Sequence, residues 1–291
     1  MPGDLLATVE VRLAAQAGPI DLSLRAREPG EALRLARCEL PRHVQDFLSR
    51  WAGSDSSLSL VHSIWLELDL DREPEDLPAP LVCAKLFPET DPRWLIGTLF
   101  PALQGKPLTA GQQRLIRRCH EAIPAPAYLL YAFSLLARGT DALRLEIFGL
   151  DPAGIVSYLE RVAPEAVPWV RDAAGLFQGV ERIHLSLDLG EEVLPRIGIE
   201  GSFSRLPGRE PRWRELFERL VRRGLCRPDK RDAVLSWHGS ETFWTAPAAW
   251  PVEAVGARGF CFRKLSHVKV VCRPGREPEA KAYLSFGYLP A

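Results

Sequence analysis

The sequence predicts an α+β fold in which ten antiparallel strands close into a barrel with helices on its outside. Three observations predict it: an internal repeat, strand pairs in which apolar and polar residues alternate, and helical apolar stripes between these pairs. Each strand pair must bury its apolar face. A two-layered sandwich is one solution, but helices that alternate with the pairs favour a barrel, which also removes exposed sheet edges. We therefore expect a single barrel domain over residues 1–291.

The repeat has an offset of 119 residues. The pattern Val-x-x-Ile-x-Leu-x-Leu-Asp-Leu begins at Val61 and again at Val180, and Pro-Arg-Trp begins at Pro92 and again at Pro211. Both offsets, 180 minus 61 and 211 minus 92, are 119 residues. Two matches in the same order at one offset indicate a duplicated unit. We expect related units near residues 61–120 and 180–237.

Each unit is predicted to contain two strands followed by a helix. Period-2 alternation, as in Ile64, Leu66 and Leu68, is typical of a strand with one apolar face. A proline then opens a helix with an apolar stripe. The same pattern predicts three further strand pairs, at 5–13 with 19–26, 127–135 with 142–150, and 260–272 with 280–288. Apolar stripes predict further helices around 44–51, 115–119, 155–162 and 229–237.

The strand residues that alternate with the apolar ones are mostly charged or aromatic. A ten-stranded barrel is wide enough to enclose a cavity, and helices on the apolar face would leave these residues facing it. Buried charges are costly unless they are paired or contact a ligand. We therefore expect an anion pocket beside an aromatic, carboxylate-bearing pocket. The alternative is a charged face that water simply solvates.

Composition excludes several functions. Lys and Arg number 37, as do Asp and Glu, so the chain lacks the basic character of a nucleic-acid-binding domain. The six cysteines form no Cys-x-x-Cys pair, which argues against a zinc site and favours free thiols in a reducing compartment. The chain has no run of about 18 apolar residues, so no membrane span is predicted. We expect a cytoplasmic protein without nucleic-acid or membrane partners.

Two local patterns resemble those of the ABBA, or PT-barrel, aromatic prenyltransferases. Lys281-Ala-Tyr283 resembles the Lys-x-Tyr strands of the indole-type members, and Glu67 with Lys85 resembles their early glutamate and the cation on the neighbouring strand. That family is built from αββα units, about five here, whose ten strands enclose a chamber. Cyanobactin-type peptide prenyltransferases form a second branch of comparable length. This chain departs from the indole type in having one Lys-x-Tyr and five tyrosines in all. Its first strand pair begins almost at residue 5, so we expect the N-terminal helix to be missing.

The resemblance implies transfer of an allyl group from an isoprenoid diphosphate to an aromatic or peptide side-chain acceptor inside the barrel. Glu67 would be the catalytic base. Tyr283 and Trp65 would shield the allyl cation. The diphosphate would be bound by Lys85, Arg144, Lys269 and Lys281. Further candidates for the barrel interior are Arg182, His184, Arg196, Glu200 and His267. No Asp-Asp-x-x-Asp cluster occurs, so we expect no obligatory cofactor and no requirement for Mg²⁺ or another metal.

Two other functions remain open at this point. The barrel could bind an anionic small molecule or an acidic peptide without reacting it, which the low tyrosine count favours. It could also be a partner protein in a biosynthetic cluster, with Trp237, Trp244 and Trp250 as an exposed recognition surface.

Overall fold

The strands form one antiparallel sheet that closes on itself. The computed structural model describes residues 6–16, 18, 20–70, 78–242 and 259–290. Around the sheet the strands run in chain order from β1 to β8, then β10 and β11, and β11 pairs with β1. The barrel strands are β1 (Leu6–Arg12), β2 (Ile20–Ala26), β3 (Val61–Leu70), β4 (Leu81–Leu86), β5 (Tyr128–Ser134), β6 (Leu143–Phe148), β7 (Arg182–Leu189), β8 (Val193–Ser202), β10 (Gly259–Arg273) and β11 (Arg276–Pro290). The predicted closed ten-stranded barrel is confirmed.

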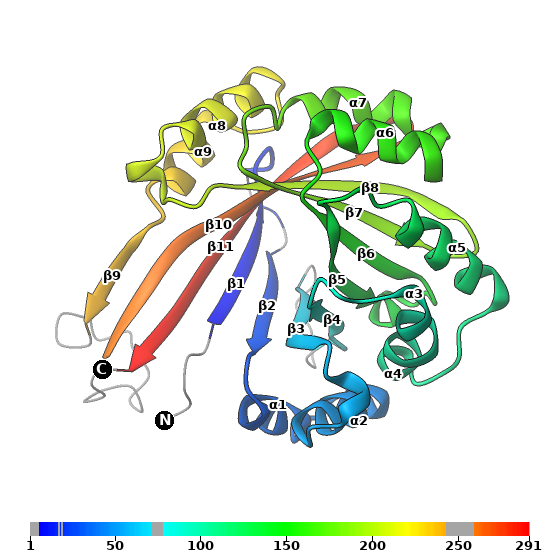
Figure 1. Ribbon diagram of the computed structural model, residues 1–291. Coiled ribbons are helices and arrows are strands. Elements are labelled where there is room, and N and C mark those ends of the chain that lie inside the picture. The colour runs from blue at the N-terminus through cyan, green and yellow to red at the C-terminus, as the bar shows by residue number, and fades with distance from the viewer. Residues whose placement is uncertain (1–5, 17, 19, 71–77, 243–258, 291) are drawn as a thin grey trace.

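The helices lie around the outside of the curved sheet, as Figure 1 shows. The α-helices are α1 (Pro29–Ala36), α2 (Arg42–Ala52), α3 (Pro92–Trp94), α4 (Phe100–Gln104), α5 (Ala110–Glu121), α6 (Pro152–Val162), α7 (Val167–Gly175), α8 (Arg212–Arg222) and α9 (Pro228–Leu235). Short 3₁₀ segments are η1 (Ser56–Leu58), η3 (Leu136–Arg138), η4 (Pro164–Ala166) and η5 (Pro207–Arg209), and η2 (Leu95–Leu99) is a π-helical turn between α3 and α4. None of the helices in the described ranges has the length and apolar character needed to cross a bilayer.

The main core lies between the barrel and its helices. The outward-facing residues of the strands, such as Ile64, Leu145 and Leu185, are fully buried in one cluster with the apolar stripes of the helices, such as Phe47 of α2 and Phe217 of α8. This arrangement leaves the opposite, polar side of each strand facing the barrel interior. The amphipathic pattern of the sequence therefore sets which side chains line the chamber.

Strand β1 closes the barrel by pairing with β11, from Leu6 opposite Gly287 to Arg12 opposite Lys281. Inside this seam the hydroxyl groups of Thr8 and Ser285 lie 2.8 Å apart and are buried. An eleventh strand, β9 (Gly239–Thr242), pairs with one end of β10 beyond the part that β8 occupies. The sequence does not predict β9, because four residues are too few for alternation to be recognised.

Candidate functional site: the barrel cavity

The barrel encloses a cavity of about 470 Å³, and all ten barrel strands contribute side chains to its wall. Ten of the twelve residues that the sequence nominates lie in this wall: Trp65, Glu67, Lys85, Arg144, Arg182, His184, Glu200, His267, Lys269 and Tyr283. The other two, Lys281 and Arg196, are not part of the cavity lining.

An aromatic section of the wall comes mainly from β5 and β6. It consists of Tyr128, Tyr131, Phe133 and Phe148, none of which the sequence nominates. A register shift between Leu129 and Tyr131 interrupts the alternation of β5, so residues on both sides of this irregularity reach the cavity. The run Tyr-Leu-Leu-Tyr-Ala-Phe is also apolar throughout, which hides its inner face from a period-2 analysis.

Arg144 is held by a carboxylate on the neighbouring strand. Its guanidinium donates two hydrogen bonds to Asp188, at 2.6 and 3.1 Å, and both side chains are buried. Arg196 lies 3.4 Å from the same carboxylate. Burial alone would raise the pKa of Asp188, but the two guanidinium groups lower it to about 2. Arg144 and Arg196 therefore have an ionised partner within the protein.

Lys281 is paired in the same way. Its Nζ donates to Glu10 Oε1 at 2.5 Å, and the Tyr283 hydroxyl donates to the other oxygen of Glu10. Burial opposes ionisation, yet Lys281 and these hydrogen bonds lower the pKa of Glu10 to about 2. The phenol ring of Tyr283 still lines the cavity, where it stacks on His267 with ring centroids 4.0 Å apart.

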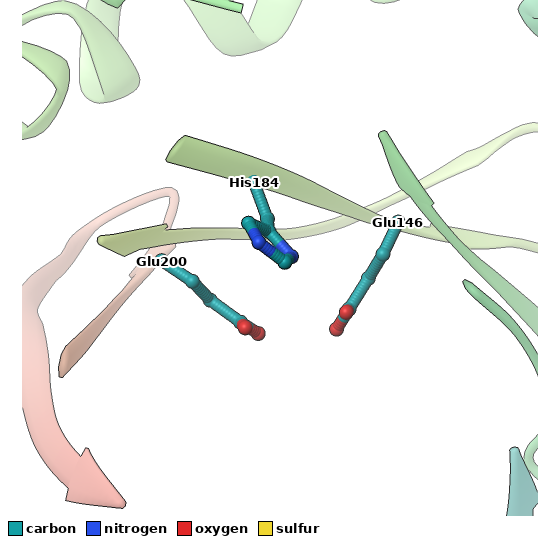
Figure 2. Close-up of side chains that lie close together, drawn as sticks. All are labelled: Glu146, His184 and Glu200. Atoms are coloured by element: carbon teal, nitrogen blue, oxygen red, sulfur yellow. The ribbon is translucent and has the colours of Figure 1, made fainter. Parts of the chain in front are cut away.

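Lys269 lies between two glutamates. Its Nζ is 2.5 Å from Glu200 Oε1 and 3.5 Å from Glu146 Oε1. Figure 2 shows the two carboxylate groups directed toward one another, with the His184 ring beside them. Burial raises the pKa of Glu200, but Lys269 more than reverses this, so Glu200 is ionised. For Glu146, burial and the charge of Glu200 raise the pKa to about 8.

The two glutamates and the histidine at this place, Glu146, Glu200 and His184, have side chains of the kinds that bind metal ions. Ligand atoms of Glu146, His184 and Glu200 lie within 4.8 Å of one another. The Lys269 ammonium, however, already pairs with both carboxylates and supplies positive charge at this place.

Glu67, which the sequence nominates as the base, forms an ion pair with Arg138. Arg138 Nη2 donates to Glu67 Oε1 at 2.9 Å, and the same guanidinium holds Asp69 at 2.7 and 2.8 Å. Glu67 thus borders the cavity while its carboxylate is paired with a cation from η3.

Four cations of the wall have no carboxylate within ion-pairing distance in the part of the chain that the structure describes: Lys85 of β4, Arg182 of β7 and Lys264 of β10, which lie on strands, and Arg205, which follows β8. Burial, followed by the charges of Arg25 and Arg27, lowers the pKa of Lys85. Burial, followed by Arg25 and Arg182, lowers that of Lys264. We call Lys85, Arg182 and Lys264 the cationic cluster. The charge of Arg182 lowers the pKa of Lys264, and Arg25 lowers the pKa of both lysines, so a bound anion would relieve this repulsion.

The sequence nominates Lys85 and Arg182 but misses Lys264. Counting from His267 by alternate residues places Lys264 on the outside. A register shift in β10 between Leu265 and His267 reverses this, and the residues from Lys264 to His267 all border the cavity.

The three tryptophans offered as a recognition surface fall into two groups. Trp237 is half-buried against the core, with the Arg263 guanidinium 5.4 Å from its ring centre. Trp244 and Trp250 lie outside the described residues.

A closed antiparallel barrel of ten strands, covered by helices and containing a charged and aromatic chamber, defines the PT-barrel class. Comparison with known proteins agrees at the level of the fold. The 6-dimethylallyltryptophan synthase from Micromonospora olivasterospora, solved in complex with DMASPP and Trp, has a TM-score of 0.51 and 15% identity, covering 97% of this chain and 81% of that one. AnaPT from Neosartorya fischeri has a TM-score of 0.51 and 11% identity, covering 99% of this chain and 78% of that one.

These structures are ABBA prenyltransferases, and the chain shares their fold, as the resemblance of its sequence implies. No protein-family model matches the chain. No curated protein matches its sequence.

Proposed function

We propose that this chain transfers an allyl group from an isoprenoid diphosphate to an aromatic or peptide side-chain acceptor inside the barrel. The observation that carries the proposal is a cavity in which an aromatic wall adjoins cations that have no carboxylate partner among the described residues. The shared PT-barrel fold supports it, and the 6-dimethylallyltryptophan synthase with this fold binds DMASPP and Trp together.

The cationic cluster is the proposed diphosphate site. When the bond between the allyl carbon and the diphosphate oxygen breaks, negative charge accumulates on the leaving group, and fixed cations stabilise it. Lys85, Arg182 and Lys264 would supply that positive charge. Arg144, Lys269 and Lys281 are nominated by the sequence for the same role, but each has an ionised carboxylate partner, so we assign them to the charge balance of the interior.

The aromatic wall is the proposed shield for the allyl cation. Tyr131, Phe133 and Phe148 face the cavity together with Trp65 and Tyr283. Ring faces attract a cation and exclude the water that would otherwise capture it. Burial raises the pKa of both tyrosines, so their phenols stay neutral at physiological pH. An indole or phenol acceptor would stack against the same surface.

We also propose that turnover needs no divalent metal. Lys269 provides the positive charge between Glu146 and Glu200, and the cationic cluster can neutralise the diphosphate. Activity that persists in excess EDTA would agree with this, whereas activity that returns only when Mg²⁺ is added would contradict it.

The test combines binding with turnover. We expect dimethylallyl or geranyl diphosphate to raise the melting temperature, because a ligand that binds only the folded state stabilises it. Replacing any one of Lys85, Arg182 and Lys264 with Gln should weaken this binding about tenfold or more, since each removes a charged hydrogen bond to the anion. Lys106→Gln is the control, because Lys106 pairs with Asp141 outside the cavity. Incubation with indole, phenol and peptide acceptors should then yield prenylated product by mass spectrometry.

A non-catalytic barrel that binds an anionic small molecule or peptide is the second candidate. The internal pairing of Arg144, Lys269 and Lys281 favours it, because these pairs balance the interior without any ligand. Stabilisation by the diphosphates without product from any acceptor would support this function and contradict transfer.

A further inference from the structure

We propose that Glu146 is the catalytic base of this transfer and takes up the proton that the acceptor loses. The inference rests on the proposed function and goes beyond it by giving the role of base to a residue other than Glu67. It stands on the position of Glu146 in the cavity and on the groups around it.

Glu146 lies where an acceptor would be held. It projects from β6 into the cavity wall, between Tyr131 on β5 and Ser186 on β7, which are its cross-strand neighbours. Tyr131 and Phe148, which flank it, belong to the aromatic wall. An aromatic acceptor held against these two side chains would lie beside the Glu146 carboxylate.

The charges around Glu146 leave one carboxylate without a full partner. Two glutamates share a single ammonium, and Lys269 lies 2.5 Å from Glu200 but 3.5 Å from Glu146. His267 approaches Glu200, at 3.4 Å, rather than Glu146. A buried carboxylate in excess of its cations binds a proton. In agreement, burial and the charge of Glu200 raise the pKa of Glu146 to about 8.

The remaining titratable groups that face Glu146 are less suited to accept this proton. Burial raises the pKa of the Cys83 thiol and of the Tyr131 phenol, so both stay protonated. Burial lowers the pKa of His184 and lowers that of His267 to about 4, so each imidazole is a weaker base than usual. Arg144 is committed to Asp188.

Glu67 is less free than Glu146 to take up a proton from an acceptor, because a guanidinium binds it directly. Its Oε1 accepts a hydrogen bond from the Arg138 guanidinium at 2.9 Å, so this oxygen is already engaged by a cation, whereas the nearest cation to Glu146 among the described residues is 3.5 Å away. A base works best when its pKa lies near the working pH, and Glu146 meets that condition.

The step balances as follows. The electron pair of the acceptor atom forms the new bond to the allyl carbon, and the bond from that carbon to oxygen breaks with its electrons leaving on diphosphate. The proton on the acceptor atom moves to a carboxylate oxygen of ionised Glu146, which later releases it to solvent through the cavity. No oxidant, reductant or further reactant is needed.

The kinetic test is the pH dependence of kcat. In the wild type we expect kcat to rise about tenfold per pH unit below about pH 8 and to level off above it, because only ionised Glu146 accepts the proton. Glu146→Gln should lower kcat by about 10² to 10⁴ and abolish this rise. Glu200→Gln should shift the rise to lower pH, since it removes the negative charge that raises the pKa of Glu146. Glu67→Gln, on the same cavity wall, should leave the pH of the rise unchanged.

A second measurement does not depend on turnover. Infrared difference spectra between pH 6 and pH 10 should show a protonated carboxyl band that disappears near pH 8 in the wild type and is absent from Glu146→Gln. Asp21→Asn is the control, because burial and the neighbouring Glu10 raise the pKa of Asp21 to about 7 and its band disappears at lower pH.

These outcomes separate the two proposals. Turnover with an unchanged pH rise in Glu146→Gln, or a missing infrared band, overturns the assignment of Glu146 and leaves prenyl transfer standing. A band near pH 8 with no turnover from any donor and acceptor instead overturns prenyl transfer, and with it the role of Glu146 as the base.

Discussion

Arg144 illustrates how the neighbours of a residue decide its role. Alternation along β6 correctly places its side chain inside the barrel, but not which group it meets there. Asp188 lies directly opposite on β7, and Glu200 lies opposite Lys269 in the pairing of β8 with β10. These ion pairs are cross-strand contacts that become evident only when the register is known. The sequence therefore predicts a charged interior but not which cations are left for a ligand.

Replacing Arg144 separates a structural role from a ligand-binding one. Arg144→Met should lower the free energy of unfolding by about 3–5 kcal/mol, because it leaves a buried carboxylate with only the more distant Arg196. The double variant Arg144→Met/Asp188→Leu should recover much of this loss, since it removes both charges. Urea denaturation measures both effects. If Arg144→Met is as stable as the wild type but binds diphosphate poorly, Arg144 belongs to the anion site instead.

At the scale of single elements, the sequence predicts which side chains of a regular strand face the cavity. It does not predict them where a strand is irregular. The clear alternation of β3 and β7 reveals which residues line the cavity. The irregularities in β5 and β10 move Tyr131 and Lys264 into the wall, and no residue pattern marks them. Bulges redirect side chains through the backbone, which is why part of the site was missed.

Strand β8 carries a glycine that its packing requires. A Cβ atom on Gly201 would collide with the ring of Phe177, which is fully buried behind the sheet. Gly201→Ala should lower the free energy of unfolding by about 1–3 kcal/mol through overpacking. Gly175→Ala, at the end of α7 and with open space around it, is the matched control and should be neutral or slightly stabilising. Equal melting temperatures for the two variants would refute this packing argument.

At the scale of the whole molecule, the fold was predictable because it repeats. Five strand pairs with helices between them admit few closed arrangements, and the apolar faces of the strands select the barrel. The cavity follows from the number of strands. Its contents depend on contacts between distant segments, such as Lys269 of β10 with Glu146 of β6, which the sequence does not specify.

The seam between β1 and β11 should control whether the barrel closes. Val9 lies in the middle of β1, opposite Leu284 on one side and Leu22 on the other. Val9→Pro removes a backbone N–H there and should open the seam, exposing two sheet edges that pair between molecules. Size-exclusion chromatography should show larger species for Val9→Pro, while Val9→Thr should elute like the wild type. Identical elution of both variants would contradict the claim that this seam controls closure of the barrel.

The same seam sets an order on how the chamber comes into being during synthesis. The Thr8–Ser285 contact joins positions 277 residues apart, so β1 emerges from the ribosome long before its partner exists. Through most of translation β1 therefore has one edge without its partner strand, and contacts between residues so far apart in the sequence form slowly. Chaperones would therefore encounter this protein as an open, incomplete barrel, and the ligand pocket forms only when the last strand has been synthesised.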